Sequence, residues 1–468
     1  MENIDQFLSH LKDAIWSAPI LLLLIGTGAY LTIILKGVQF RYLGYAIKQV
    51  FARARMDSEG DISPFEALMT SLAGAIGTGA IVGVATALAV GGLGSIFWMW
   101  VTAFVGMATK YAESLLAVKY RVIDERGEMM GGPAQYIEKG LGWRWMAFLF
   151  AFLGAAGAIT TGNLVQVNAI TEAVQHLKTM DPFWIGVVLA GLTGLVIIGG
   201  VKSIGHVAGV LVPIMALFYM AGGILIIAMH LDKIPGAFVL IFKSAFTGQA
   251  ATGGFLGATL MMAIQSGVSR SVFSNEAGLG ISSIAAAAAK TDSPGRQGMI
   301  TMTGALVSTV IVCTVTGLVL AVTGVHGATN EAGDVLNGAS MAFAAFGSSI
   351  AGGGYIVSVG LILFAFSTVI AWAYYGEKCF EYIFGSRSVV IYRILFTLII
   401  IPGSVMKMEL AWHLADITNG LMVIPNLIAL IGLSGVIVAE NRKFLDLVKK
   451  EQQDEVDMNM HKAMNIKP

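Results

Sequence analysis

Charged residues are scarce in this chain of 468 residues, because Asp, Glu, Lys and Arg together make up only 12% of it. Soluble domains carry about 25% charged residues. With a hydrophobic fraction of 56% and a mean hydropathy of +0.77, an aqueous monomer would precipitate. The composition therefore predicts an all-α polytopic membrane protein in a lipid bilayer. Acidic and basic residues both number 29, so the net charge gives no indication of a nucleic-acid partner.

Cysteine and the common enzyme signatures are also nearly absent. Cys313 and Cys379 are the only cysteines, which excludes a disulfide framework and a cysteine-based metal site. The seven histidines are scattered, and no G-x-x-x-x-G-K-[ST] motif is present, so ATP is not the expected energy source. We therefore expect a protein that is not an enzyme, has no organic cofactor and depends on an ion gradient.

Long apolar segments are the most abundant feature of the chain. A helix needs about 20 apolar residues to cross a bilayer, and about eleven segments reach that length. They lie near 15–35, 64–90, 93–118, 145–177, 183–201, 206–229, 251–287, 299–323, 350–376, 389–406 and 411–438. The first ends without a cleavage site of the signal-peptide type, so we interpret it as a retained helix.

Lys and Arg gather in every second connection between these segments, beginning with the connection after the first segment. Basic residues favour the cytoplasmic side of a membrane. We therefore expect a multi-pass protein of the plasma membrane with its N-terminus outside and its C-terminus in the cytoplasm. Residues 41–55 form either a basic amphipathic helix on the inner surface or an ordinary basic connector.

The run TSLAGAIGTGA at 70–80 lies inside a segment long enough to span the membrane, yet it is crowded with glycines and hydroxyls. Glycine makes a helix easy to interrupt. An interruption at Gly77, Thr78 and Gly79 would expose N–H groups and a positive helix end that favour an anion such as a carboxylate. The carbonyls between Ala73 and Ile76 would suit a cation.

A second interruption is predicted at 265–280 (QSGVSRSVFSNEAGLG). If the first helix is peripheral, the remaining spans form two halves of about five spans each, and each half starts with an interrupted helix. This pattern indicates a transporter with inverted repeats, although glycine and serine patches also permit tight helix packing. The predicted divisions are a peripheral helix and basic segment at 1–60, a first repeat at 61–233, a second repeat at 234–440 and a charged cytoplasmic tail at 441–468.

Charged residues in the second interruption are costly at membrane depth and usually functional. Arg270 needs a partner of opposite charge, and Glu113 and Glu276 are the candidates. The alternative is that these charged side chains lie at the inner membrane interface and extend into water, as is expected for Lys110. Phe273 would be a lid over a bound solute or an ordinary packing residue.

Two other apolar helices carry groups that suit a small polar solute. Asn163 and Gln166 share a helix face, where their amides would bind a zwitterion or bond a neighbouring helix. The hydroxyls of Ser367 and Thr368 would serve as oxygen ligands for Na⁺, or bond the carbonyl of the preceding turn. Trp372 lies one turn further and would line the same cavity.

Several of these segments resemble a known family. GGLGSIFWMWVTAFVG at 91–106 resembles the defining motif of the sodium:alanine/glycine symporters. The stretches 70–79, 273–280 (FSNEAGLG) and 364–379 (FAFSTVIAWAYYGEKC) are similar to that family too. The resemblance covers about 15–440.

The resemblance implies a LeuT-type fold of five-plus-five inverted repeats with one extra N-terminal helix. It also implies Na⁺-coupled import of small neutral amino acids, chiefly alanine and glycine, with D-alanine in some members. The amides of Thr78 and Gly79 would then bind the substrate carboxylate, and Trp372 would touch the substrate side chain. The implied Na⁺ ligands are the carbonyls of Ala73, Ile76 and Phe364 and the hydroxyls of Ser367 and Thr368. The implied substrate contacts in the second interruption are Phe273, Ser274 and Asn275.

Two other classes of function remain open at this point. A proton-coupled transporter or exchanger of the same fold would use Glu113 or Glu276 as its proton carrier. A channel or receptor would not need two matched interruptions. The sequence therefore favours alternating access, in which Na⁺ binds first and raises the affinity for alanine.

Overall fold

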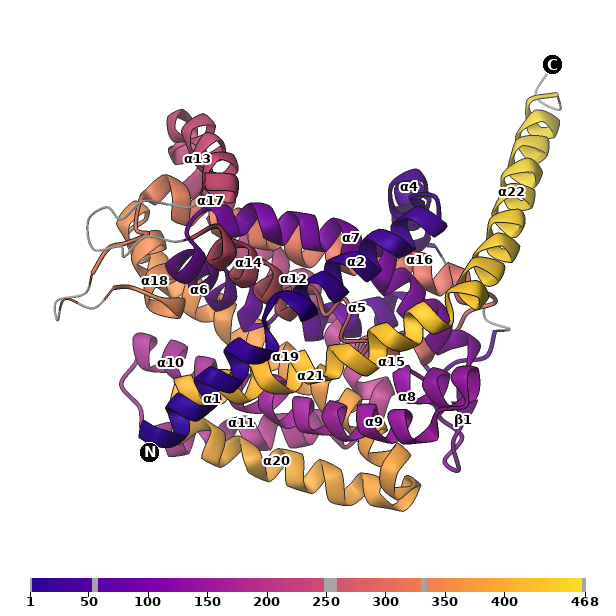
Figure 1. Cartoon of the computed structure of the whole chain (residues 1–468), viewed down its shortest axis with the longest axis horizontal. Coiled ribbons are helices and arrows are strands. Elements are labelled where there is room, and N and C mark those ends of the chain that lie inside the picture. The colour runs from indigo at the N-terminus through magenta and orange to yellow at the C-terminus, as the bar shows by residue number, and fades with distance from the viewer. Residues whose placement is uncertain (1, 53–57, 248–258, 330–332, 334, 465–468) are drawn as a thin grey trace.

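The computed structural model describes residues 2–52, 58–247, 259–329, 333 and 335–464. Among these residues the chain is a bundle of long helices with one short β-hairpin (Figure 1). By length and composition, six helical stretches can cross a membrane, or seven if Asp5–Ile15 and Ala18–Ile34, which meet at 41°, count as one. The six stretches are Arg144–Leu177, Gly200–Met229, Pro294–Thr323, Gly353–Phe384, Ser386–Val405 and Met408–Gly432. The expectation of about eleven spans stays a prediction.

The N-terminal part of the bundle runs from α1 to α13. Its helices are α1 (Glu2–Ile15), α2 (Ala18–Ile34), α3 (Val38–Arg41), α4 (Leu43–Val50), α5 (Pro64–Ala75), η1 (Thr78–Ala80), α6 (Val82–Gly91), α7 (Gly94–Lys119), α8 (Pro133–Tyr136), η2 (Ile137–Leu141), α9 (Arg144–Ile159), η3 (Thr160–Leu164), α10 (Val165–Leu177), α11 (Pro182–Ile197), α12 (Gly200–Met229), η4 (Leu231–Lys233) and α13 (Ile234–Thr247). The hairpin consists of β1 (Val122–Ile123) and β2 (Met129–Met130), paired antiparallel between α7 and α8.

The C-terminal part begins after the residues that the structure leaves undescribed at 248–258, where part of the predicted 251–287 segment falls. Its helices are α14 (Leu260–Asn275), α15 (Ser283–Ala287), α16 (Pro294–Ala305), η5 (Leu306–Cys313), α17 (Thr314–Thr323), α18 (Gly338–Ser349), α19 (Gly353–Phe384), η6 (Ser386–Ser388), α20 (Val389–Val405), α21 (Met408–Gly432) and α22 (Ser434–Met464). The helices that the sequence did not predict include α1, α13, α18 and most of α22, and the predicted spans 206–229 and 350–376 start inside α12 and end inside α19.

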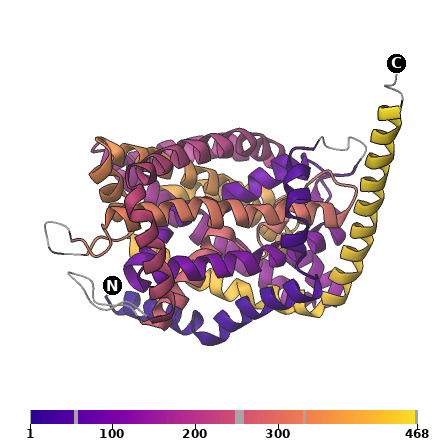
Figure 2. The ribbon, with the colours of Figure 1, turned by 90° about the horizontal axis from the view of Figure 1, so that it is seen from above.

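The two ends of the bundle differ. In Figure 1, the hairpin, α4 and α22 lie at the right-hand end, whereas α1, α10 and α18 lie at the left-hand end. Figure 2 shows α22 standing apart from the other helices at one end of the bundle, with its C-terminal end projecting beyond them. Within the segment 41–55, the structure has α4 packed against α16, and residues 53–57 lie outside the described part.

The first interruption lies where the glycines predicted it. Pro64 starts α5, and the side chains of Ser63 and Glu66 cap its N-terminus in a capping box. The helix ends at Ala75, and Gly77 separates it from the short turn η1, which leads into α6. One membrane-length segment is therefore two helical halves with free backbone groups between them.

The second interruption occupies only the last residues of the predicted stretch 265–280. Residues 265–275 are helical to the end of α14, and the turn begins at Glu276 (φ 59°) and includes Gly278 (φ 90°). The serine-rich stretch stays helical because its hydroxyls find partners that do not disrupt it: Ser271 Oγ, for instance, donates to the carbonyl of Met99 on α7, 3.1 Å away. Residues with positive φ, a conformation that favours glycine, therefore locate this interruption more accurately than the serine content of the sequence does.

A cluster of charged side chains fixes the hairpin region to the end of α19. The ammonium of Lys378 lies 3.0 Å from carboxylate oxygens of Asp124 and Glu128 and 3.1 Å from one of Glu381. Burial raises the pKa of Asp124, but the backbone N–H of Glu128 and the charge of Lys378 outweigh it and lower this pKa to about 2. Asp124 is therefore ionised at physiological pH, and the ion pairs hold.

Lys378→Met is expected to destabilise the protein strongly. Removing one partner of a buried ion pair costs about 3–5 kcal/mol, and we expect the lower end because Arg126 stays 3.0 Å from Glu381. The measurement is the apparent melting temperature of purified protein in detergent. Lys139→Met, at an exposed position in η2, is the matched control. Equal melting temperatures for the two variants would contradict this role of Lys378.

Candidate functional site

Two adjacent hydroxyls on α19 reach the broken end of α5. Thr368 Oγ1 lies 2.8 Å from the carbonyl oxygen of Ala73, and Ser367 Oγ lies 3.4 Å from the same oxygen. Both hydroxyls are also within hydrogen-bond distance of the carbonyl of Phe364, at 3.1 and 2.8 Å. Four of the five oxygen donors predicted for Na⁺ thus lie in one cluster that joins α5 to α19.

The contact with Ala73 separates the two interpretations of the hydroxyl pair. A bond from Thr368 to Phe364 alone would be the ordinary local bond of a hydroxyl in an apolar helix. Ala73, however, belongs to another helix, and its carbonyl is available because α5 ends two residues later, at Ala75. Ile76 follows directly and is fully buried, and its N–H donates to the carbonyl of Leu72.

The side chain of Gln166 occupies the other half of the interruption. The N–H of Thr78 donates to Gln166 Oε1 at 3.1 Å, and Gln166 Nε2 donates to the carbonyl of Thr161 at 3.0 Å. A methyl group at Gly77 would lie 2.9 Å from Gln166 Oε1 and would overlap Thr368 Oγ1. Gly77 is therefore the point at which α5, α10 and α19 approach one another.

Phe273 covers the start of η1. A methyl group at Gly79 would lie 2.8 Å from Phe273 Cδ1. The ring of Phe273 also packs against Trp412 of α21, with the ring centroids 4.7 Å apart. Thr78, the first residue of η1, has a buried hydroxyl for which the described residues offer no hydrogen-bond partner.

The next two residues of α14 are bonded to other elements. Ser274 Oγ lies 3.0 Å from Cys313 Sγ and 3.3 Å from Thr309 Oγ1, both in η5. The side chain of Asn275 donates to Ser271 Oγ and accepts from the N–H of Ala277. The structure therefore brings Phe273 to the first interruption, whereas the side chain of Ser274 faces η5 and that of Asn275 supports the second interruption.

The two predicted amides, Asn163 in η3 and Gln166 in α10, serve different neighbours. Asn163 Nδ2 donates to the carbonyl of Phe396 on α20 at 2.8 Å, whereas Gln166 faces Thr78. Between α9 and α10 the residues Thr160–Leu164 form a π-helical turn, which the sequence did not predict. Gly162 in this turn lies directly against Trp372, which is buried and whose indole N–H lacks a hydrogen-bond partner of normal geometry among the described residues.

The partner of Arg270 is neither Glu113 nor Glu276, which corrects the sequence interpretation. Arg270 Nη2 lies 2.5 Å from a carboxylate oxygen of Asp416 on α21. Because Arg270 lies within helical α14 rather than in an irregular segment, its side chain faces α21. An aspartate in an apolar helix is itself a signal of function, and the sequence analysis overlooked Asp416.

Two other deep charges, Lys110 and Glu113, are also bonded inside the protein. Lys110 does not extend into water: it is fully buried, and its ammonium donates to the carbonyl of Asn275 at 2.7 Å. One oxygen of Glu113 accepts from the N–H of Gly278 and from the side chain of Asn426. These contacts fix the second interruption against α7 and α21.

The groups around the first interruption are closed to solvent. Thr78 and Ser367 are fully buried, Thr368 is 1% exposed and Phe273 is 6% exposed. A solute that enters this site needs the helices around it to move apart. The arrangement therefore suits a carrier that opens to one side at a time rather than a continuous pore.

The arrangement of the helices is similar to that of a solved structure. The structure of MhsT in complex with L-phenylalanine matches with a TM-score of 0.58 and 14% identity, covering 82% of this chain and 93% of that one. This likeness confirms the expected LeuT-type fold with interrupted helices. At this level of identity it shows the fold alone.

Sequence relatives define the family. The sodium/alanine symporter AgcS of Methanococcus maripaludis is 50% identical over 94% of this chain and 97% of its own length. The probable sodium/glutamine symporter GlnT of Bacillus subtilis is 38% identical over 93% of this chain and 90% of its own length. The profile of the sodium:alanine symporter family matches residues 1–458. The interrupted helices and the buried oxygen cluster are thus those of a multi-pass membrane transporter that couples to sodium, and not of an enzyme. The chain belongs to the sodium:alanine symporter family.

Proposed function

We propose that this protein uses the Na⁺ gradient to import alanine, and also glycine and D-alanine, across the plasma membrane. The observation that carries the proposal is the buried oxygen cluster of Ala73, Phe364, Ser367 and Thr368, which joins the broken helix to α19. The N-terminus would face outward and the C-terminus the cytoplasm, in line with the distribution of basic residues. The relative AgcS, which carries the name of a sodium/alanine symporter, supports alanine as the substrate.

The proposed Na⁺ site consists of three carbonyls and two hydroxyls. Hard cations bind oxygen ligands, and the donors are Ala73, Ile76, Phe364, Ser367 and Thr368. Thr368 Oγ1 lies 2.8 Å from the carbonyl oxygen of Ala73, so the ligands from α5 and α19 are already close to one another. With Na⁺ bound, the oxygens would turn toward the ion, and α5 and α19 would be held in the geometry that the substrate needs.

The proposed carboxylate site uses the N–H groups at Gly77, Thr78 and Gly79, where the positive end of a helix favours an anion. Gln166 Oε1 accepts the Thr78 N–H at 3.1 Å, so the substrate carboxylate would displace it. The freed Gln166 amide would then donate to the carboxylate through Nε2. This exchange keeps the buried N–H satisfied in both states.

The proposed side-chain pocket is bounded by Phe273 and Trp372. Trp372 leaves little room because it packs directly on Gly162, and a small pocket excludes larger side chains by steric clash. Asn163, Ser274 and Asn275 would support the walls of this pocket through their bonds to neighbouring helices. The name of the relative GlnT indicates that other members of the family accept glutamine, so we expect the pocket walls to differ between members.

Uptake into proteoliposomes tests the proposal, with Na⁺ and pH gradients imposed separately. An inward Na⁺ gradient at equal pH is expected to drive accumulation of alanine, glycine and D-alanine. A proton gradient in the absence of Na⁺ is expected to drive none. Accumulation that follows the proton gradient alone would instead favour a proton carrier such as Glu113 or Glu276.

Gln166→Glu is expected to weaken alanine binding by about tenfold or more, because two like charges placed side by side cost several kcal/mol. The measurement is the Kd for radiolabelled alanine at saturating Na⁺. Gln175→Glu, at an exposed position on the same helix, is the matched control. Unchanged affinity in Gln166→Glu would show that the carboxylate does not bind beside this amide.

A further inference from the structure

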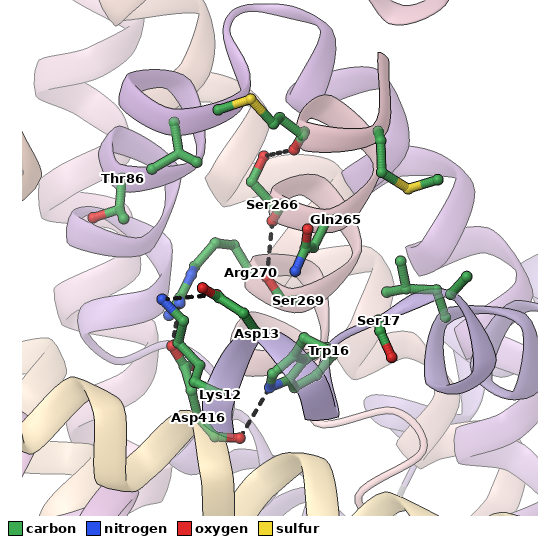
Figure 3. Close-up of a pocket in the computed structure, with 15 residues that line it drawn as sticks. Lys12, Asp13, Trp16, Ser17, Thr86, Gln265, Ser266, Ser269, Arg270 and Asp416 are labelled. Atoms are coloured by element: carbon green, nitrogen blue, oxygen red, sulfur yellow. Dashed lines mark hydrogen bonds and ion pairs between the residues drawn. The ribbon is translucent and has the colours of Figure 1, made fainter. Parts of the chain in front are cut away.

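A second polar cavity lies at the end of the bundle that carries α1. It has a volume of about 680 Å³ and lies between α1, α2, α6, α14 and α21. The side chains of Lys12, Asp13, Arg270 and Asp416 gather on one side of it (Figure 3). Gln265 lines the cavity from α14. The cavity is separate from the Na⁺ cluster, none of whose residues lines it.

Arg270 connects this cavity with the central site. Its guanidinium stacks over Trp412, with Cζ 4.7 Å from the ring centroid, and Trp412 packs on Phe273. The Trp16 N–H donates to the carbonyl of Asp416 at 2.9 Å, which fixes the start of α2 to the same pair. A continuous stack therefore starts next to Gly79 and runs through Phe273 and Trp412 to Arg270. This stack separates the two sites.

Half of the Arg270 guanidinium is left without a partner. Nη2 is paired with Asp416, but Nη1 has no hydrogen-bond partner among the described residues, although Arg270 is only 9% exposed. A buried donor without a partner is costly, and the planar fork of arginine is shaped to bind a carboxylate. The unpaired nitrogen belongs to a residue that lines the cavity, so a ligand there can satisfy it.

The charges around the cavity identify the kind of ligand. Lys12 and Arg270 are cations, Asp13 and Asp416 are anions, and Lys12 lies 3.3 Å from Asp13. A site with both signs in equal number suits a zwitterion better than a simple anion. The volume lies within the range of about 300–1,000 Å³ found for small-molecule pockets, so side chains much larger than methyl fit.

We propose that this cavity is a second amino-acid site, on the outer face, which binds neutral amino acids too large for the central site. The carboxylate of the ligand accepts from Arg270 Nη1, and its ammonium lies beside the carboxylate of Asp13. Because Arg270 covers the stack over Phe273, a ligand held here blocks the outward route of a bound alanine. The outer location and this blocking effect rest on the proposed function, whereas the binding itself does not.

The first test is equilibrium binding of radiolabelled L-leucine to the purified full chain in detergent with Na⁺. We expect saturable binding that weakens by about tenfold or more in Arg270→Lys, which keeps the charge but loses the second N–H of the fork. L-Leucinol, which has no carboxylate, is expected to compete at least about tenfold more weakly than L-leucine.

A second pair of variants leaves the ion pair untouched. Val90→Trp fills the cavity from α6 and is expected to abolish leucine binding without a change in the Kd for alanine, whereas Val90→Ala, the matched control, is expected to keep both. Retained alanine binding also shows that the variants are folded. Leucine binding that is absent from the wild type, or unchanged in both Arg270→Lys and Val90→Trp, would overturn the proposal.

Release kinetics separate this proposal from a single shared site. Protein loaded with labelled alanine is diluted into Na⁺ buffer with or without unlabelled L-leucine. A competitor for the central site leaves the release rate unchanged, whereas a ligand in the outer cavity is expected to slow release severalfold. Equal rates would contradict the blocking effect. If the chain does not load alanine at all, the proposed function fails, and the leucine-binding test still decides on the cavity.

Discussion

Thr368→Ala is expected to raise the Na⁺ concentration for half-maximal alanine uptake by about tenfold or more, because bonds to charged groups contribute about 1.5–3 kcal/mol each. Thr368 Oγ1 lies 2.8 Å from the Ala73 carbonyl and is the closest side-chain link between α19 and the broken end of α5. Its loss removes one Na⁺ ligand and also this link. The measurement is the Na⁺ dependence of initial uptake rates in proteoliposomes, normalised to the amount of reconstituted protein.

Thr397→Ala is the matched control for this variant. Thr397 Oγ1 makes the same kind of local bond, 2.8 Å to the carbonyl of Arg393, in an apolar helix. Its removal is expected to leave the Na⁺ dependence unchanged. If Thr368→Ala behaved like Thr397→Ala, the hydroxyl of Thr368 would have only the local structural role, and the Na⁺ ligands would lie elsewhere.

Gly77→Ala is expected to reduce alanine uptake to background. The φ of Gly77 is −107°, outside the left-handed region that favours glycine, so the effect is attributed to the space that the added methyl group needs. That methyl group would overlap Thr368 Oγ1 and lie 2.9 Å from Gln166 Oε1. The ion and carboxylate sites would be displaced together, and overpacking of this kind costs about 1–3 kcal/mol of stability in addition.

Binding of radiolabelled alanine and size-exclusion chromatography separate loss of the site from loss of the fold. Gly83→Ala is the matched control, because it lies in the same interrupted segment and its methyl group would have no neighbour nearer than Arg270 Cδ at 3.8 Å. Uptake by Gly77→Ala at the level of Gly83→Ala would show that α5, α10 and α19 do not meet closely at Gly77 during transport.

The features that the sequence predicted best are those determined by short, local stretches of residues. Glycine crowding at 70–80 predicted the first interruption, and the α5 helix does end at Ala75. The adjacent hydroxyls of Ser367 and Thr368 stood out in an apolar helix, and the structure brings them to Ala73. Local conformational preference and side-chain chemistry are sufficient for such predictions.

The features that the sequence did not predict depend on contacts between distant segments. The candidate partners named for Arg270 were Glu113, on another helix, and Glu276, one turn and a half further along, but its partner is Asp416 on α21, 146 residues away. The role of Gln166 as the acceptor for the Thr78 N–H likewise depends on how α10 packs against η1. Pairing of this kind is decided by helix packing, which a single sequence does not encode locally.

The second interruption lies inside the predicted stretch 265–280, but its exact position was not predicted, for a related reason. Serine competes with the helical backbone for hydrogen bonds, and this argued for a break within 265–280. In the folded protein Ser271 bonds to α7 and Ser274 to η5, so the helix continues through them. Tertiary contacts thus overcame a local preference, and the turn moved to Glu276 and Gly278.

The most direct test of the account is the reciprocal effect of Na⁺ and alanine on each other's binding to the purified protein, measured by isothermal titration calorimetry. If Na⁺ at Thr368 holds α5 in the geometry that binds the carboxylate, Na⁺ raises the affinity for alanine, and alanine raises the affinity for Na⁺ by the same factor. We expect this factor to be at least about fivefold and to fall toward one in Thr368→Ala. Equal affinity for alanine in Na⁺ and in K⁺ would contradict the account.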